Sequence, residues 1–465
     1  MLFVGLVACA VLAVGAAARP PVALHPGNPR YFLFRGRPTV LITSGEHYGA
    51  VLNRDFDYVR YLDTLKAAGY NLTRTFAGSY VEVPGAFAIA GNTLSPADGR
   101  FVCPWARSET PGYARGGARF DLWRWDPAYF ARLTDFCLQA GRRGIVVEIV
   151  PFCPFYDEGL WRVSPMNAGN NVNGIGAVPR EEALTLQHSD LVEVQERLLR
   201  KLSEALAGFD NVYFEVCNEP YVCGVPEDWQ DHMAAVLAEA ERARPRPHLI
   251  ARNWANGSAL IDRPRPHISI HNFHYAWPPR AVEENAALRQ PIAFDETGFR
   301  GTADLPYRSE AWAFLMAGGA VYSNLDYSFT VGHEDGSFVP PSTQPGGGGP
   351  SLRAGLSALK RFVERLDILR MAPVPPRSVP GAVSVWALSD RERAWALYAL
   401  GRGEGAIVLA LPAGSYAVEW VDPSTGAFVE TARLRHPGGE ARLTPPPYAE
   451  DIAAHIRRQG GSPGR

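Results

Sequence analysis

The chain has 465 residues, of which 46 % are hydrophobic and 20 % are charged, and its formal net charge is −2 at pH 7. This composition is typical of a globular protein. Only three of the 46 basic residues are lysines, and the arginines are scattered along the chain rather than gathered in a stripe or tail. Binding to nucleic acid or to an anionic membrane needs concentrated positive charge, so the sequence argues against both kinds of partner.

The N-terminus has the pattern of a secretory signal peptide. An apolar run from Leu2 to Val14 is followed by small residues and by Arg19-Pro20, which predicts a signal peptide over residues 1–18 and a secreted or periplasmic protein. The segment ending at Cys9 also resembles a lipobox, so a lipid anchor through Cys9 is the alternative. The run is too short to span a bilayer, and no later stretch reaches about 18 uninterrupted apolar residues, so we expect no membrane span.

Residues 24–370 show a regular alternation of buried strands and amphipathic helices. A hairpin around residues 31–43 leads into the first strand, and helical patterns include residues 56–65, residues 191–206 with Asp190 and Glu193 as a capping box, and residues 352–369. The eight apolar or β-branched runs are 39–45, 71–76, 144–150, 211–216, 248–252, 267–272, 291–295 and 320–325. Eight such strands predict an α/β fold with a parallel sheet closed into a (β/α)8 TIM barrel. An open doubly wound sheet is the alternative, but no glycine-rich phosphate-binding motif follows the first strand.

The C-terminal part of the chain has a different pattern. Residues 371–382 are rich in proline and predict a linker between domains. Short strand patterns separated by Gly, Pro and Asp turns follow in residues 383–458 and predict a small all-β sandwich. Residues 459–465 form a polar tail. We expect the sandwich to cover one flank of the barrel, and carbohydrate binding by Trp420 is the alternative role.

The cysteines do not indicate a metal site. Without the signal peptide the chain has five cysteines, at positions 103, 137, 153, 217 and 223, and none forms a CxxC pair. A zinc site is therefore not expected. Buried free thiols are the favoured role, and one disulfide remains the alternative.

Two glutamates occupy the ends of predicted barrel strands. Glu219 follows the fourth strand in Asn218-Glu219-Pro220-Tyr221, and Glu296 ends the seventh strand. The carboxyl ends of barrel strands surround one mouth, where active sites lie. Two carboxylates that face each other there can cleave a glycosidic bond, because one protonates the leaving oxygen while the other attacks or activates water.

These motifs resemble the retaining glycoside hydrolases of clan A, the family 5 cellulase-like group, over residues of roughly 30 to 370. The resemblance implies that Glu219 is the acid/base, that Glu296 is the nucleophile and that Asn218 contacts the sugar 2-hydroxyl. It also implies that Arg74, near the end of the second strand, keeps the nucleophile ionised. A His or Tyr after the sixth strand is expected to touch the nucleophile, and His274 and Tyr275 are favoured over His271, with a structural role for either histidine as the alternative. A poly- or oligosaccharide substrate is expected, with no metal or organic cofactor.

Further substrate contacts are predicted in loops at the same mouth. Tyr221, Trp161, Trp105 and Asp326 are the candidates, although the tryptophans could instead pack the loops onto the barrel and Asp326 could cap a turn. The segment 46–48 ends the first strand, where it either lines the mouth or caps the turn.

The chain departs from the family pattern at two strands, because it lacks the usual tryptophan at the eighth and the usual histidine at the third. These departures argue against a true cellulase. We therefore expect a secreted retaining β-glycosidase of another specificity. A non-catalytic carbohydrate-binding or cell-wall-associated protein on the same barrel is the alternative.

Overall fold

The computed structural model describes residues 19–459, except residues 245, 380–382 and 403–404. The predicted signal peptide, with Cys9, and residues 460–465 of the predicted tail lie outside the described residues. Within the described part of the chain, no helix combines the length and the apolar character needed to cross a membrane.

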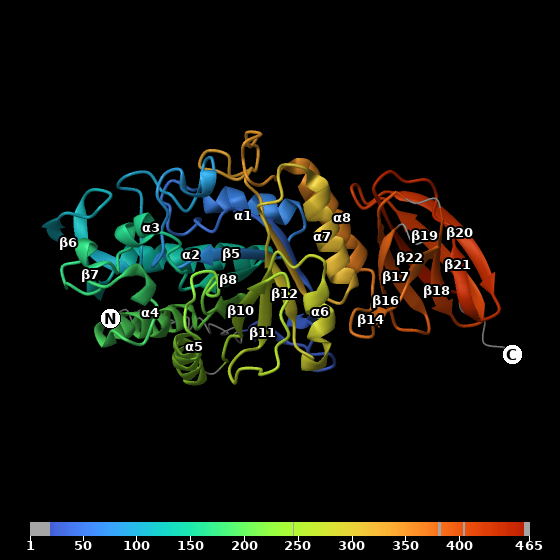
Figure 1. Ribbon diagram of the computed structural model, residues 1–465, viewed down its shortest axis with the longest axis horizontal. Coiled ribbons are helices and arrows are strands. Elements are labelled where there is room, and N and C mark those ends of the chain that lie inside the picture. The colour runs from blue at the N-terminus through green and yellow to red at the C-terminus, as the bar shows by residue number, and fades with distance from the viewer. Residues whose placement is uncertain (1–18, 245, 380–382, 403–404, 460–465) are drawn as a thin grey trace, which may run out of the picture.

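An eight-stranded parallel sheet forms the centre of the molecule (Figure 1). Its strands follow one another around the sheet in the order β4-β13-β12-β11-β10-β9-β8-β5. Their bounds are β4 (Leu41–Gly45), β5 (Leu72–Phe76), β8 (Val146–Val150), β9 (Val212–Glu215), β10 (Ile250–Asn256), β11 (Ile270–His274), β12 (Ile292–Glu296) and β13 (Val321–Leu325). Each overlaps one of the eight predicted runs. The (β/α)8 barrel is therefore confirmed, and the open doubly wound sheet is not found.

Asn71 joins the first barrel strand to the second. Its backbone N–H donates to the carbonyl of Ile42 over 3.3 Å. Its side-chain Oδ1 accepts from the backbone N–H of Ile42 over 2.9 Å, and its Nδ2 donates to the carbonyl of Val40 over 2.8 Å. One side chain thus supplies hydrogen bonds where β4 and β5 have no ladder of their own.

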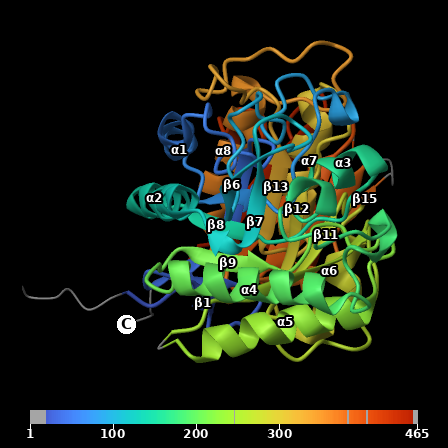
Figure 2. The same cartoon turned by 90° about the vertical axis from the view of Figure 1, so that its left-hand side faces the viewer.

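The helices lie around the outside of the sheet (Figure 2). They are α1 (Tyr58–Ala67), α2 (Pro127–Arg143), α4 (Ser189–Leu206), α5 (Glu227–Arg242), α6 (Arg280–Glu284), α7 (Asp304–Met316) and α8 (Pro350–Val363), while the short α3 (Glu158–Val163) belongs to the loop after β8. The predicted capping box is wrong, because α4 begins before Asp190 and its N-cap, His188, makes no side-chain cap. Helix α8 also ends six residues before the predicted end at Leu369.

Two antiparallel elements stand outside the barrel sheet. The predicted N-terminal hairpin is present as β2 (Phe32–Phe34) and β3 (Arg37–Thr39), with β1 (Ala23–Leu24) beside β2. A second hairpin, β6 (Trp105–Pro111) and β7 (Ala118–Trp125), lies within the long loop between β5 and α2 and was not predicted.

The C-terminal residues form two antiparallel sheets, as predicted. One has the order β14-β16-β17-β22-β19-β20 and the other the order β15-β18-β21. Their strands are β14 (Ala372–Val374), β15 (Arg377–Val379), β16 (Ser384–Ser389), β17 (Ala394–Leu400), β18 (Ala406–Leu411), β19 (Gly414–Val421), β20 (Phe428–His436), β21 (Gly439–Leu443) and β22 (Asp451–Arg458). Both β14 and β15 lie in the segment predicted as a linker, so much of that segment belongs to the sheets. They are edge strands, where proline costs no ladder hydrogen bond.

The C-terminal sheets pack directly on α7 and α8, which separate them from the barrel (Figure 1). Residues 307–316 of α7 are all buried, because the helix is covered on one side by the barrel and on the other by the sheets. Trp312 of α7 stacks on Tyr398 of β17 with ring centroids 5.6 Å apart. Trp420 is only 1 % exposed and belongs to the core of the β domain. Sugar binding by that ring is therefore ruled out, and the sheets cover the flank of the barrel.

Candidate active site

The two predicted catalytic carboxylates meet at the mouth of the barrel. Glu296 is the last residue of β12, and Glu219 follows β9 in the next loop. His274, the last residue of β11, lies between them, with its Nδ1 3.1 Å from Glu219 Oε1 and 3.4 Å from Glu296 Oε1. One ligand-type atom of each of the three side chains lies within 4.8 Å of the others. The strand ends thus place two carboxylates on opposite sides of one small space.

Arg74 of β5 connects these groups from below. Its Nη1 donates to Glu296 Oε2 over 3.1 Å, and its Nη2 donates to Asn218 Oδ1 over 2.8 Å. The guanidinium is fully buried, so these bonds form away from bulk water. Arg74 therefore fixes both the carboxylate of Glu296 and the amide of Asn218.

Electrostatics favour an ionised Glu296. Burial raises the pKa of this carboxyl, but the charge and hydrogen bond of His274, followed by the charge of Arg74, outweigh burial and lower the pKa from 4.5 to about 2. Burial alone would lower the pKa of His274, yet the charges of Glu296 and Asp295 raise it well above its ordinary value. The strongest lowering influence on Glu296 is therefore His274, rather than the predicted Arg74.

Two tyrosines complete the hydrogen bonds of the carboxylates. The hydroxyl of Tyr275 donates to Glu296 Oε1 over 3.3 Å, and that of Tyr156 donates to Glu219 Oε2 over 2.8 Å. Asn218 Nδ2 also donates to the Tyr156 hydroxyl over 2.9 Å. Tyr156 was not among the predicted site residues. Its place six residues after the end of β8 was the only signal in the sequence.

A second group of carboxylates lies deeper in the barrel, around Arg74. Glu148 and Asp295 both approach Arg74 Nε at 3.7 Å, and Glu215 forms an ion pair with its Nη2. Asn272 Nδ2 donates to Glu148 over 2.9 Å and to Asp295 over 2.7 Å. Burial and the charge of Glu215 raise the pKa of Asp295 well above its ordinary value, and burial raises that of Glu148 to about 7. Burial of this cluster therefore favours the protonated forms of Glu148 and Asp295 more than water does.

A pocket of about 70 Å³ opens above the two carboxylates. Its lining residues are His47, Tyr48, Phe76, Tyr80, Glu82, Phe87, Leu94, Cys153, Tyr156, Asn218, Glu219, Tyr275, Glu296, Phe299 and Leu325. Eight described residues other than glycine have a positive φ, and four of them line this pocket: Tyr48, Phe87, Glu219 and Tyr275. Strained backbone of this kind gathers at functional sites, because the surrounding structure must hold it in place.

The segment 46–48, after the first barrel strand, does both things that were predicted as alternatives: one residue caps the turn and two line the pocket. Glu46 caps the turn, since its carboxylate accepts from the backbone N–H groups of Gly49 and Ala50 over 2.9 and 3.1 Å. His47 and Tyr48 line the pocket instead.

Four other predicted contacts are not brought to the pocket. Trp105 is 1 % exposed, and the indole N–H of Trp161 donates to the carbonyl of Val178, so both pack loops. Asp326 is buried with Arg353 and Ser44, at 2.7 and 3.1 Å.

Tyr221, the fourth of these residues, donates its hydroxyl to Asn256 beside the rim, over 2.7 Å. None of these four residues is among the lining residues of the pocket.

The histidine and carboxylates at the mouth also form two ligand-type triads. These are Glu219, His274 and Glu296, and Glu215, His274 and Asp295. Each triad therefore offers one histidine and two carboxylates as possible ligands. In both triads, however, Arg74 already pairs with a carboxylate, and a cation bound there would have to compete with this guanidinium.

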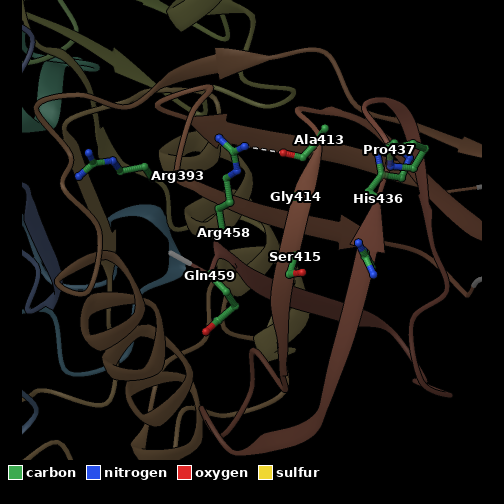
Figure 3. Close-up of a pocket in the computed structure, with 9 residues that line it drawn as sticks. Arg393, Ala413, Gly414, Ser415, His436, Pro437, Arg458 and Gln459 are labelled. Carbon is green, nitrogen blue, oxygen red and sulfur yellow. Dashed lines mark hydrogen bonds between the residues drawn. The ribbon is translucent and has the colours of Figure 1, made fainter. Parts of the chain in front are cut away.

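A larger depression, of about 1,290 Å³, lies on the β domain (Figure 3). It is open to solvent and lined by Arg393, Arg435 and Arg458 beside His436 and the β19 backbone. Arg458 donates to the carbonyl of Ala413 across it. No carboxylate is among its lining residues in the described chain, so it lacks the groups for acid and base chemistry that the barrel mouth has.

The comparisons with known proteins agree with this architecture. No family model matches the sequence, and no curated protein matches it. Solved structures do match over most of this chain, and glycoside hydrolases are among those with the highest TM-scores.

Two of these structures come from Bacteroides vulgatus. A candidate glycoside hydrolase is 17 % identical, with a TM-score of 0.66, and the match covers 95 % of this chain and 82 % of that one. A glycoside hydrolase of family 5 is 13 % identical, with a TM-score of 0.62, over 94 % and 93 % of the two chains. A family 5 mannosidase from Rhizomucor miehei is 11 % identical, with a TM-score of 0.51, over 75 % and 99 %. At these identities the likeness establishes the fold.

Proposed function

We propose that the protein is a retaining glycoside hydrolase that cleaves β-glycosidic bonds of a poly- or oligosaccharide. The observation that carries this proposal is the pair Glu219 and Glu296, whose nearest oxygens lie within 4.8 Å across the barrel mouth. Carboxyl groups about 5–5.5 Å apart are typical of retaining enzymes, whereas inverting enzymes keep them about 6.5–9.5 Å apart to admit a water molecule.

The first step forms a glycosyl-enzyme. Glu296, kept ionised by His274 and Arg74, attacks the anomeric carbon while the bond to the leaving oxygen breaks. Glu219 gives its proton to that oxygen, so the leaving group departs as an alcohol. Arg74 and Tyr275 hold the carboxylate of Glu296 in one orientation.

The second step releases the sugar. Glu219, now a carboxylate, accepts a proton from a water molecule that attacks the anomeric carbon. The bond between this carbon and Glu296 breaks, and both glutamates return to their initial states. Two inversions give a product with the configuration of the substrate.

The choice of substrates to test follows from the fold. A mannosidase is among the structures that share it, so β-mannosides belong in the panel beside β-glucosides and β-xylosides. We also propose that the protein acts outside the cytoplasm, which is supported by the apolar run at residues 2–14.

The first experiment compares the wild type with Glu296→Ala on β-linked polysaccharides and aryl glycosides. Wild type should release reducing ends or aryl alcohol, and Glu296→Ala should lose at least about 1,000-fold in kcat, because the covalent step disappears. Glu109→Gln, at an exposed glutamate of β6, is the matched control and should keep full activity.

A second variant separates the two roles. Glu219→Ala should be slow on alkyl glycosides, but it should form the glycosyl-enzyme readily from aryl glycosides whose leaving group needs no proton. Equal activity of Glu296→Ala and wild type would refute the proposal. Binding without turnover across the panel would favour the non-catalytic alternative, and loss of activity with a chelator would favour a metal-dependent reaction.

A further inference from the structure

One carboxylate in the pocket has no part in the mechanism above. Glu82 comes from the long loop between β5 and α2, is 2 % exposed and lines the pocket together with His47. Its Oε1 accepts from the Tyr80 hydroxyl over 3.1 Å and lies 3.3 Å from His47 Nε2, and its Oε2 accepts from Asn92 Nδ2 over 2.5 Å.

The polar groups at this end of the pocket are only partly satisfied. Among the described residues, His47 is the only ionic partner of the Glu82 side chain. His47 Nδ1 and the Tyr48 hydroxyl are buried, and neither has a hydrogen-bond partner. Buried polar atoms without partners are rare and costly, and a bound molecule that carries hydroxyl groups would supply the missing bonds.

The catalytic glutamates define which part of a substrate reaches this end. Glu219 protonates the departing oxygen, so the leaving group lies on the side of Glu219. The sugar ring that Glu296 attacks lies on the other side. His47 follows β4, which lies two strands from Glu296 of β12 in the sheet order, and both residues line the pocket, so His47 lies on the side of this ring.

The pocket is small. Its volume of about 70 Å³ is well below the roughly 300–1,000 Å³ of typical ligand pockets. At the rim, Phe87 and Phe299 are 38 % and 42 % exposed, and their ring centroids are 6.5 Å apart, edge to face. This distance leaves no room for a sugar chain between the two rings.

We propose that Glu82 and His47 close the far end of the pocket and bind the hydroxyl groups of a terminal sugar residue, so that the enzyme removes single sugars from the non-reducing end of its substrate. This inference rests on the proposed glycosidase function. Among the described residues, Glu82 Oε2 accepts from Asn92 alone and has an acceptor position left for one sugar hydroxyl, and His47 Nδ1 is free to bond a further polar atom.

The direct test uses wild-type protein and β-linked tetrasaccharides labelled at the reducing end. Removal of terminal sugars predicts that labelled trisaccharide and free monosaccharide are the first products. Labelled mono- or disaccharide as the first product would overturn the inference and leave the glycosidase function intact. Cleavage of no substrate in the panel would instead count against the proposed function itself.

A variant tests the role of Glu82. Glu82→Gln keeps the size of the side chain, and it should lower kcat/KM on an aryl glycoside about 10- to 100-fold, because a charged acceptor is lost. Glu109→Gln serves again as the control. The ratio of kcat/KM between wild type and Glu82→Gln should differ between the parent glycoside and its monodeoxy analogues.

One deoxy position should abolish most of the difference between wild type and Glu82→Gln, because the hydroxyl that Glu82 binds is already missing. An equal loss on every analogue would overturn direct contact and indicate a structural role. The thermal unfolding midpoint of each variant shows whether the protein is folded.

Discussion

At the scale of single residues, His274 has the largest influence on the charge of Glu296, the proposed nucleophile. Its Nδ1 faces both Glu219 and Glu296, and its charge is the largest influence that lowers the pKa of Glu296. Because this pKa is about 2 in the folded protein, the contribution of ionised Glu296 to stability is complete above about pH 4.5. It is lost as the pH falls from there toward 2.

Replacement of this histidine should move the acidic limb of the pH profile. In His274→Asn the positive charge is absent, so the pKa of Glu296 rises and the nucleophile becomes protonated at a higher pH. The acidic limb of kcat/KM should therefore shift to higher pH, measured on an aryl glycoside between roughly pH 3 and 8. His333→Asn, at an exposed histidine, should leave the profile unchanged. An unshifted limb in His274→Asn would contradict the assigned influence.

The core of the site could be predicted from sequence because its residues belong to strands. Arg74, Glu219 and Glu296 occupy or follow runs with clear apolar patterns, and a parallel barrel gathers the carboxyl ends of all its strands at one mouth. Once the strands are counted, the meeting of these residues follows.

The rest of the pocket comes from loops, which have no such periodicity. Glu82, Phe87 and Phe299 reach the site through backbone courses that depend on tertiary packing. The same cause explains why Trp105 and Trp161 do not line the pocket. Aromatic residues in long polar loops are typical of sugar binding, but here the loop after β5 folds into the β6–β7 hairpin and the loop after β8 into α3, and the two tryptophans are buried.

At the scale of elements, the junction between β4 and β5 depends on one side chain. Asn71→Ala removes two hydrogen bonds and leaves the N–H of Ile42 and the carbonyl of Val40 without those partners. Unpaired groups of this kind cost about 1–3 kcal/mol each. We expect a loss of about 2–4 kcal/mol in the free energy of unfolding, measured with urea.

Gln187→Ala, at an exposed residue, is the control for this measurement and should change stability by less than about 0.5 kcal/mol. An unchanged midpoint in Asn71→Ala would mean that the ladder hydrogen bonds of the other strands hold the barrel closed without this side chain.

At the scale of the whole molecule, Arg308 connects the barrel to the β domain. From α7 it donates to both carboxylate oxygens of Asp451 in β22, over 2.9 and 3.0 Å, and to Glu450 over 3.0 Å. The Tyr398 hydroxyl also donates to Asp451 over 3.0 Å. The charge and hydrogen bonds of Asp451 raise the pKa of Arg308 despite its burial. The contact is therefore a buried, bidentate ion pair between domains.

Removal of one partner should be more harmful than removal of both. Arg308→Met leaves Asp451 buried and unpaired, which costs about 3–5 kcal/mol. The double variant Arg308→Met with Asp451→Asn should recover much of this loss. Urea unfolding of the single and double variants measures both effects, with the exposed Arg37→Met as control. If the loss of unfolding free energy in the double variant equals the sum of the losses in the two single variants, the two residues act independently.

Helix α7 has no face exposed to solvent over residues 307–316, and this has a consequence for how the protein can be re-engineered. A helix buried on both sides cannot be left behind when the C-terminal sheets are cut away, since truncation would expose its aromatic outer surface to water. The β domain thus completes the packing around the barrel and is not a module that can be exchanged independently. Any trimmed version would first need a polar exterior for α7.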